Sequence, residues 1–278
     1  MGNRKRVCLL FITLITLSSI IGLSLTRGVT SIPTNSLVTD KNSVNVLILG
    51  VDCGNDKLPC KGRSDTIMIA HLEAKKNGAT LLSIPRDLWV EIPSRVPSKI
   101  NTAYFHGGPE LAVATVERNF GIHIDAYVTV NFDGFVSIVN TVGGVDIPEE
   151  GRLTGCEALR YVRNRSLLGD DFTRMERQQQ FLLAVRDKIL RPGVIPQLAP
   201  KVPQLLQEMD GSIQTDLSIA EITELLWEVR DVRTVSTVVI DGKYGHAEIS
   251  PQGWWILVPH WPQIHQLLEE LEIKGGNK

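Results

Sequence analysis

The chain has 278 residues, of which 43% are hydrophobic and 22% are charged, and its formal net charge is −2. This length suits one large domain or two small ones, with enough apolar content for a substantial core. Four of the 29 basic residues, Arg4, Lys5, Arg6 and Arg27, lie near the N-terminus, which leaves 25 basic against 31 acidic residues in the rest of the chain. This acidic surplus argues against nucleic acid as a partner, because non-specific binding to nucleic acid requires a strongly basic face.

An uncharged apolar run of 19 residues occupies positions 7–25. As a helix it would extend about 28 Å, close to the thickness of a bilayer core. The basic residues before it predict a cytoplasmic N-terminus at residues 1–6 and export of the chain that follows. We expect an uncleaved transmembrane helix. A cleavable signal peptide is the alternative, although the run is longer than a signal core and no small-x-small triplet follows it directly.

After this anchor we expect a linker and one domain. Residues 26–43 are rich in Ser, Thr, Asn and Gly, a composition that predicts a flexible tether. No internal repeat, low-complexity tract or second linker follows, so residues 44–275 are expected to form a single extracytoplasmic domain. The predicted location is the cell membrane, with one span and with the domain on the periplasmic or cell-surface side.

The domain is expected to begin with three strands, at residues 44–51, 66–72 and 80–84. The first is an almost continuous run of branched apolar residues, as in a strand buried on both faces. Asn77-Gly78 lies between the second and third strands and is a strong hairpin signal.

Polar residues stand at the ends of these strands. Asp52 ends the first strand, Asp65 precedes the second, and Arg86 follows the third. If the three strands are antiparallel in sequence order, all three side chains lie at one edge of the sheet. Two carboxylates beside an arginine at such an edge are a reasonable site for a hard cation, Mg²⁺ or Mn²⁺.

The next segments alternate between helix and strand. Residues 109–120 have helical spacing, with Pro109 near the start and Gly121 just past the end. A strand at 126–132 precedes a helix at 133–142, after which Gly143-Gly144 turns the chain into residues 145–147. This alternation predicts an α/β domain.

Capping-box patterns predict the starts of further helices at Thr154, Thr173 and Ser218, each followed three residues later by Glu. The remaining expected elements are helices near 197–209, 218–229 and 262–271 and strands near 235–240 and 254–258.

One face of the predicted helix that starts at Thr173 forms a stripe that is polar at its first turns and apolar further along. Arg174, Arg177 and Gln178 are at its first turns, and Phe181 and Val185 follow on the same face. Cations are locally unfavourable at a helix N-terminus, so a role in binding an anion is the better explanation for these arginines. The apolar continuation of the stripe would line a hydrophobic pocket.

Carboxylates together with several arginines and a glutamine are the groups that grip a diphosphate and neutralise charge while a phosphorus–oxygen bond breaks. A phosphoryl-transfer site is therefore our leading hypothesis. Arg163, Arg165 and Lys99 are further candidate cations, although Arg163 and Arg165 also suit a helix C-terminus and a lone lysine is usually solvated.

The chain has no G-x-S-x-G elbow, no P-loop signature and no H-E-x-x-H helix, which removes the simple signatures of serine hydrolases, P-loop nucleotidases and zinc peptidases.

Four cysteines are present. Cys8 lies in the membrane segment, and Cys156 is expected in a buried helix. Outside the cytoplasm Cys53 and Cys60 either form a disulfide that stiffens the loop between Asp52 and Asp65 or remain two free thiols.

The order and spacing of the polar clusters resemble the LytR-CpsA-Psr (LCP) family of membrane-anchored cell-envelope enzymes. The matching stretches lie within about residues 44–190 and are Asn45 to Asp52, Arg63-Ser64-Asp65-Thr66, Leu82 to Asp87, Lys99-Ile100-Asn101, and Tyr161 to Arg165 leading into Asp171 and Arg174-x-x-Arg177-Gln178-Gln179. The N-terminal anchor fits as well, and the C-terminal third matches less closely. The resemblance implies a single LCP-type α/β domain, with a central mixed β-sheet flanked by helices and one transmembrane helix before it.

The resemblance also implies a phosphotransferase that moves a glycopolymer from a polyprenyl-diphosphate carrier to peptidoglycan or another envelope acceptor. By position, Asp52 and Asp65 would hold Mg²⁺. The diphosphate would be bound by Arg86, Arg163, Arg165, Arg174 and Gln178, with Lys99 and Arg177 as further candidates. Family members bury the polyprenyl tail in an apolar tunnel between sheet and helices. The Cys53–Cys60 loop, and Cys156 where a polar residue is usual, depart from the family pattern.

In the expected reaction a sugar hydroxyl attacks the phosphorus nearer the glycan and polyprenyl phosphate leaves. Arg86 and Arg174 would stabilise the developing charge. Asp171 is either the general base or a partner that holds Arg174 in place. Two other functions remain open, a diphosphatase with water as acceptor and a non-enzymatic envelope regulator or scaffold.

Overall fold

The computed structural model describes residues 43–54, 56–73, 76–164, 171–191, 211–218, 221 and 232–273. The predicted transmembrane helix, nearly all of the linker, Arg165, the helix near 197–209 and most of the helix near 218–229 lie outside the described residues. Within the described ranges no helix combines the length and the apolar character needed to cross a bilayer.

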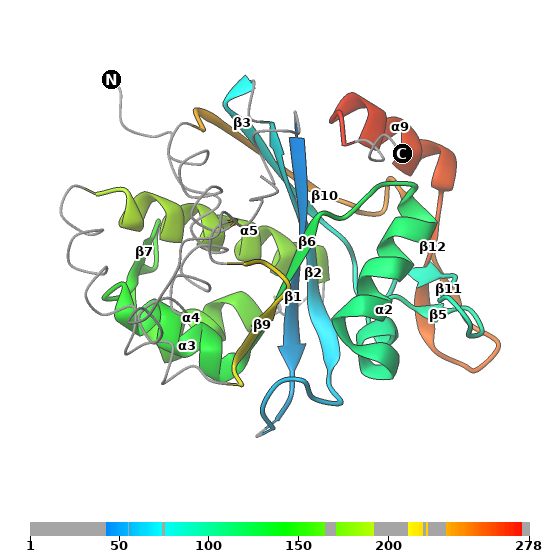
Figure 1. Ribbon diagram of the computed structural model, residues 1–278, viewed down its shortest axis with the longest axis horizontal. Coiled ribbons are helices and arrows are strands. Elements are labelled where there is room, and N and C mark those ends of the chain that lie inside the picture. Colours follow the sequence, from blue (N-terminus) through cyan, green and yellow to red (C-terminus); the bar gives the residue numbers. More distant parts are fainter. Residues whose placement is uncertain are drawn as a thin grey trace, which may run out of the picture.

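A six-stranded mixed sheet forms the centre of the molecule, in the order β10-β3-β2-β1-β6-β9 (Figure 1). Its strands are β1 (Ser43–Asp52), β2 (Arg63–Glu73), β3 (Gly78–Ser83), β6 (Ala126–Asn131), β9 (Ile213–Thr215) and β10 (Thr234–Val239). The pairs β1/β6 and β3/β10 are parallel, and the other neighbours are antiparallel. The expected α/β class with a mixed sheet is confirmed.

Helices cover both faces of this sheet. The three helices α3 (Phe132–Thr141), α4 (Gly155–Arg163) and α5 (Asp171–Ile189) lie on one side, and α2 (Thr102–Phe120) and α9 (Trp261–Glu270) lie on the other (Figure 1). Short two-stranded ribbons complete the described fold: β4 (Trp89–Val90) with β5 (Ser98–Lys99), β7 (Val145–Ile147) with β8 (Gly151–Leu153), and β11 (Gly245–Ile249) with β12 (Trp255–Pro259).

Strand β1 supplies both halves of the core, as its sequence predicts. Val44, Val46 and Ile48 pack against the α3/α4/α5 layer, and the alternate residues Leu47, Leu49 and Val51 pack against the α2/α9 layer. Successive side chains of a strand point to opposite faces, so a continuous apolar run is what a central strand of a three-layer fold needs.

The hairpin and the first helix are confirmed, with changes at their ends. Strands β2 and β3 pair in antiparallel register through the turn at Asn77, whose φ of 48° is positive. Helix α2 ends at Gly121 as predicted but begins at Thr102, earlier than expected. The expected start at residue 109 reflects a real break, because Gly107 and Gly108 are non-helical and Gly108 has a φ of 67° that favours glycine.

Two expectations for the later helices are wrong. Helix α5 does not begin at Thr173, because Asp171 and Phe172 are already helical. Asp171 supplies the acidic first turn that a helix N-terminus favours, and it forms an i,i+3 ion pair with Arg174. Cys156 lies on α4 as expected, but its side chain is exposed and its thiol is free.

Three further local features are present in the described residues. Helix α4 begins directly after Thr154, whose backbone N–H donates to Glu157 Oε2 at 2.8 Å. The capping contact between Ser218 and Glu221 is also present. Cys53 and Cys60 form a disulfide, with their Cα atoms 5.7 Å apart.

Candidate active site

The centre of the candidate site is Asp65, which lies at a β-bulge. Along β1 and β2 the register pairs Gly50 with Thr66 and then Val51 with Ser64, so Asp65 has no partner on β1. A bulge redirects the side chain and the backbone carbonyl of the extra residue. Because β1, β2 and β3 are antiparallel in sequence order, the end of β1, the start of β2 and the end of β3 share one sheet edge, as predicted.

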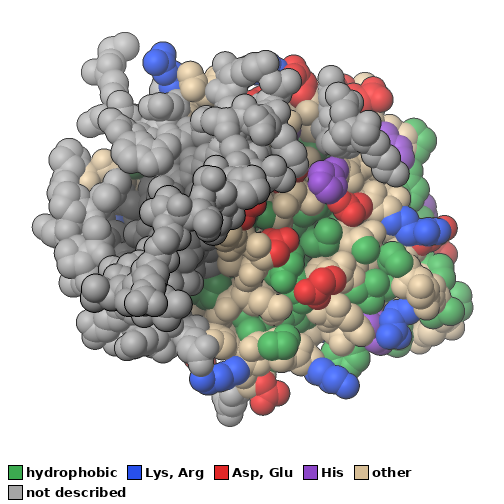
Figure 2. Space-filling model, in the orientation of Figure 1, with side chains coloured by type: hydrophobic (Ala, Val, Ile, Leu, Met, Phe, Trp, Pro, Cys, Tyr) green, Lys and Arg blue, Asp and Glu red, His purple; other side chains and the backbone are tan. Residues whose placement is uncertain are grey.

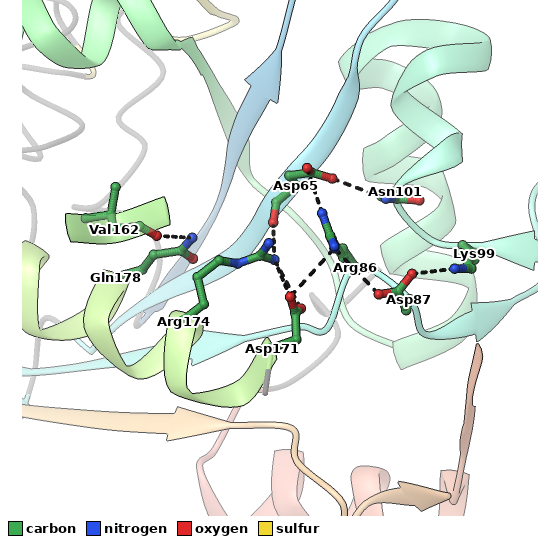
Figure 3. Close-up of polar contacts among 9 residues, drawn as sticks. All are labelled: Asp65, Arg86, Asp87, Lys99, Asn101, Val162, Asp171, Arg174 and Gln178. Carbon is green, nitrogen blue, oxygen red and sulfur yellow. Dashed lines mark hydrogen bonds and ion pairs between the residues drawn. The ribbon is translucent and has the colours of Figure 1, made fainter. Parts of the chain in front are cut away.

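Two side chains from the α2 side of the sheet reach the Asp65 carboxylate. Arg86 follows β3, and its Nη1 donates to Asp65 Oδ2 at 2.8 Å (Figure 3). Asn101, the buried N-cap residue of α2, directs its Nδ2 to Asp65 Oδ1 at 3.4 Å. The carboxylate is thus held in one orientation by groups from two different elements.

Arg174 approaches Asp65 from the opposite side. Its guanidinium is buried, with the residue 5% exposed, and Nη2 donates to the Asp65 carbonyl oxygen and to Asp171 Oδ2, each at 3.0 Å. Asp171 also lies 3.7 Å from Arg86 Nε. Arg86 and Arg174 therefore converge on the rim around Asp65 and Asp171, although they are far apart in the sequence (Figure 3).

A cavity of about 290 Å³ opens beside this cluster, between the sheet and helices α3, α4 and α5. Its polar lining residues are Asp65, Thr66, Asn131, Arg163, Arg174 and Gln178, and its apolar ones are Ile48, Leu49, Met68, Val130, Phe132, Phe135, Leu159, Val162, Phe181 and Leu182, with Gly50 completing the wall. Of the stripe predicted on α5, Arg174, Gln178 and Phe181 line the cavity, whereas Arg177 and Val185 do not. Such a shape suits an amphiphile with an anionic head and an apolar tail.

Three of the seven predicted diphosphate ligands line this cavity, namely Arg163, Arg174 and Gln178. Arg163, the last residue of α4, lines it and lies over the Phe132 ring, 4.2 Å from the ring centre. Gln178 lines it as well and directs Nε2 to the Val162 carbonyl at 3.4 Å. Arg177 instead donates to the Asn164 carbonyl at 2.9 Å and is not among the lining residues.

Lys99 lies away from the cavity lining. Its Nζ donates to Asp87 Oδ1 at 2.6 Å. Asp87 in turn lies 3.5 Å from Arg86 Nε, so Lys99, Asp87 and Arg86 form a chain of alternating charge (Figure 3). A direct role of Lys99 in binding diphosphate stays a prediction.

Sequence reasoning missed two residues that hold the site together. Asp87 adjoins Arg86 in the sequence, but nothing in that pattern shows that it joins Lys99 to Arg86. Gln179 is buried, and its Nε2 donates to Ser83 Oγ at 2.9 Å and to the Val238 carbonyl at 2.7 Å. It thereby ties α5 to β3 and β10. The only available signal for Gln179 was its place beside Gln178.

Asp52 lies at the same edge, opposite Arg63 in the β1/β2 register and next to the bulge. Its side chain is exposed, and Oδ1 accepts from the Gly54 backbone N–H at 3.1 Å. In the described part of the chain no group of three His, Cys, Asp or Glu residues is arranged to hold a metal ion. The two aspartates offer only oxygen atoms, which are suitable ligands for Mg²⁺ if water and substrate oxygens supply the rest.

The fold and the site together define a class, that of α/β proteins with a cavity of apolar and charged lining at one edge of a mixed sheet. Within that class, this chain belongs to the LytR_cpsA_psr family, whose model matches residues 23–273.

Named relatives and solved structures agree with this family. The polyisoprenyl-teichoic acid–peptidoglycan teichoic acid transferase TagU of Oceanobacillus iheyensis is 32% identical over 246 residues, which cover 81% of this chain and 74% of the relative. The crystal structure of B. subtilis TagV superimposes with a TM-score of 0.66 at 30% identity, covering 83% of this chain and 97% of TagV. The structure of the LytR-CPS2A-psr family protein YwtF (TagT) with bound octaprenyl pyrophosphate has a TM-score of 0.62 at 26% identity, covering 84% of this chain and 90% of TagT.

Proposed function

We propose that this protein is a membrane-anchored phosphotransferase that moves a glycopolymer from a polyprenyl-diphosphate carrier to peptidoglycan or another envelope acceptor. Its relatives are named as transferases of polyisoprenyl-linked teichoic acid, which supports this assignment. The N-terminal segment would keep the domain at the membrane that carries the lipid-linked substrate.

The observation that carries this proposal is the cavity between the sheet and α3, α4 and α5. Its apolar walls suit a polyprenyl chain, and its charged and amide groups are Asp65, Asn131, Arg163, Arg174 and Gln178. Guanidinium groups bind phosphate oxygens with charge-assisted hydrogen bonds, whereas a purely apolar cavity would not select a diphosphate over an alcohol.

In the proposed reaction the oxygen of an acceptor hydroxyl attacks the phosphorus bonded to the glycan. A new phosphorus–oxygen bond forms to the acceptor, and the bond from that phosphorus to the bridging oxygen breaks. The bridging oxygen keeps the electron pair and leaves as polyprenyl monophosphate, while the hydroxyl proton passes to a base or to solvent. Arg86 and Arg174 stabilise the charge that develops on the phosphate oxygens.

Asp171 has a clear structural task in this scheme. Its carboxylate lies 3.0 Å from Arg174 and 3.7 Å from Arg86. We therefore assign it as a positioning residue for the two guanidinium groups. Asp87 has the corresponding task for Arg86 and Lys99.

Asp52 and Asp65 are the residues proposed to hold Mg²⁺ or Mn²⁺. When bound there, the cation would neutralise charge on the non-bridging phosphate oxygens. Both oxygens of the Asp65 carboxylate accept hydrogen bonds, from Arg86 and from Asn101, so a cation would bind through their remaining lone pairs.

Reconstitution tests the proposed function. The full chain in vesicles is mixed with a lipid-linked glycopolymer and soluble peptidoglycan fragments, and the products are identified by mass spectrometry. We expect a phosphodiester-linked conjugate, and we expect Arg174→Gln to lower its rate of formation by at least about 100-fold, as for the loss of one oxyanion-stabilising group.

The matched control is Arg191→Gln, just past the far end of α5, where an exposed arginine pairs with Asp146 at 2.8 Å. This variant should retain the wild-type rate. Release of free phosphorylated glycan without conjugate would show a diphosphatase and contradict the proposed transfer.

A further inference from the structure

A second polar surface lies on the α2 side of the rim, across the sheet edge from the cavity. Asn101, which contacts Asp65, is the N-cap of α2. Phe105 lies one helical turn further on the same face of the helix. Part of its ring faces solvent, since the residue is 41% exposed.

The ring of His106 lies edge-on to the ring of Phe105, with the ring centres 5.2 Å apart. The pKa of His106 is lowered from its ordinary value, first by partial burial and then by the positive charges of Arg95 and Arg63. Arg63 stands at the start of β2, two residues before Asp65, and Arg95 lies in the loop at residues 91–97, which leads through β5 to Asn101. In the described part of the chain neither guanidinium forms an ion pair with a carboxylate.

The loop at residues 91–97 continues this surface away from the rim. Together with Arg118 it lines an open hollow of about 550 Å³. Val96, in this loop, is 80% exposed. Elsewhere on the α2 side in the view of Figure 2, acidic, basic and apolar side chains are interspersed. We call Arg63, Arg95, Phe105 and His106 the α2 strip.

The geometry of phosphoryl transfer indicates which substrate would reach this location. The attacking and leaving oxygens stand roughly in line on opposite sides of the phosphorus. If the leaving polyprenyl phosphate occupies the cavity on the α3/α4/α5 side, the acceptor hydroxyl must approach from the other side of Asp65. That side is where Asn101 and helix α2 lie (Figures 1 and 3).

We propose that the α2 strip is the acceptor subsite and binds a saccharide chain that carries carboxylate groups, as peptidoglycan does with its peptide stems. This inference rests on the proposed function. The exposed Phe105 ring offers an apolar face for the C–H face of a sugar ring, and Arg63 and Arg95 offer paired donors to carboxylates. A neutral saccharide would use the aromatic contact alone.

Direct binding to the full chain in detergent micelles tests the proposal. The probe is a peptidoglycan tetrasaccharide with free peptide-stem carboxylates, and chitotetraose serves as the neutral comparison. We expect the charged probe to bind at least about tenfold more tightly than chitotetraose, and Arg63→Gln with Arg95→Gln to remove that difference. Phe105→Ala should weaken both probes by about five- to tenfold.

Matched controls are Trp254→Ala, an exposed aromatic residue near the β11–β12 hairpin, and Arg191→Gln. Neither should change binding of either probe. Binding of octaprenyl diphosphate should be unchanged in all of these variants, which also shows that they fold.

The acceptor assignment is overturned if the strip variants bind the charged tetrasaccharide as the wild type does, or if they weaken octaprenyl diphosphate instead. The binding assay needs no turnover, so the two proposals can fail separately. A chain that binds the tetrasaccharide through these residues but transfers no polymer would contradict the proposed function and leave the binding site in place.

Discussion

At the scale of single residues, Asp65 joins the two sides of the site. Its carbonyl oxygen accepts from Arg174, and its carboxylate accepts from Arg86 and Asn101. One residue can serve both sides because the bulge frees it from pairing with β1. Replacement of Asp65 would therefore alter both arginines together.

The role of Asp171 is testable through its isosteric variant. Asp171→Asn keeps the size of the side chain but removes the charge that pairs with Arg174 and Arg86. If Asp171 positions these arginines, we expect kcat of transfer to fall by about tenfold, the lower end of effects from a displaced charge-stabilising group. The pH profile of kcat should keep its shape. Loss of one limb of that profile in the variant would instead identify Asp171 as the general base.

His71 predicts how stability depends on pH. It is 1% exposed, and its Nδ1 lies 2.7 Å from Asn45 Oδ1. Burial lowers its pKa from 6.5, an effect that the charges of Glu73, Asp125 and Glu272 only partly oppose. The unfolded chain therefore binds the proton on His71 more tightly than the folded chain does. The contribution of neutral His71 to the free energy of unfolding is fully present above the pKa that His71 has in the unfolded chain, and it is lost as the pH falls below that value.

Thermal unfolding of the full chain should therefore show a lower Tm at pH ~5.5 than at pH ~7.5. His71→Asn removes the titrating group and should flatten this dependence. If the Tm of the variant depends on pH as steeply as that of the wild type, groups other than His71 determine the pH dependence.

Some residue assignments were accessible from the sequence, and others required the fold. Asp65, Arg86 and Arg174 stand out because polar residues interrupt apolar patterns at strand and helix ends. The pairing of Asp87 with Lys99 and the three-way contact of Gln179 depend on loop paths and helix rotation, which local patterns do not encode. The exposure of Cys156 depends in the same way on which face of α4 meets the core.

At the scale of elements, the connection between β1 and β2 determines the shape of the rim. It runs from Asp52 to Arg63, and the Cys53–Cys60 disulfide closes it near both ends. The longer strands and helices were predictable because their periodic patterns extend over many residues. The two- and three-residue strands β4, β5, β8 and β9 carry no such pattern, since tertiary contacts alone define them.

Loss of the disulfide should destabilise the protein measurably. Cross-linking a loop of this length removes unfolded-state entropy worth about 2–3 kcal/mol. Urea unfolding of Cys53→Ser/Cys60→Ser should therefore show a free energy of unfolding lower by that amount, with Cys156→Ser as a control that changes only an exposed thiol. Equal stability of the double variant and the wild type would show that the bridge does not constrain the loop.

At the scale of the whole molecule, the sheet separates two proposed substrate sides. The cavity for the lipid-linked donor lies between the sheet and α3, α4 and α5, and the proposed acceptor subsite lies beside α2. The central sheet and most of its surrounding helices could be predicted from the alternation of apolar runs in the sequence. The full lining of the cavity could not, because its walls come from six elements whose distances only packing determines.

The most direct test of the account is equilibrium binding of octaprenyl diphosphate to the full chain in detergent micelles, compared with octaprenol and with the Arg174→Gln variant. We predict that the diphosphate binds, that octaprenol binds at least about 100-fold more weakly, and that Arg174→Gln weakens diphosphate binding at least about tenfold while Arg191→Gln does not. Equal affinity of the wild type and Arg174→Gln for the diphosphate would contradict the claim that the guanidinium groups at this sheet edge hold it.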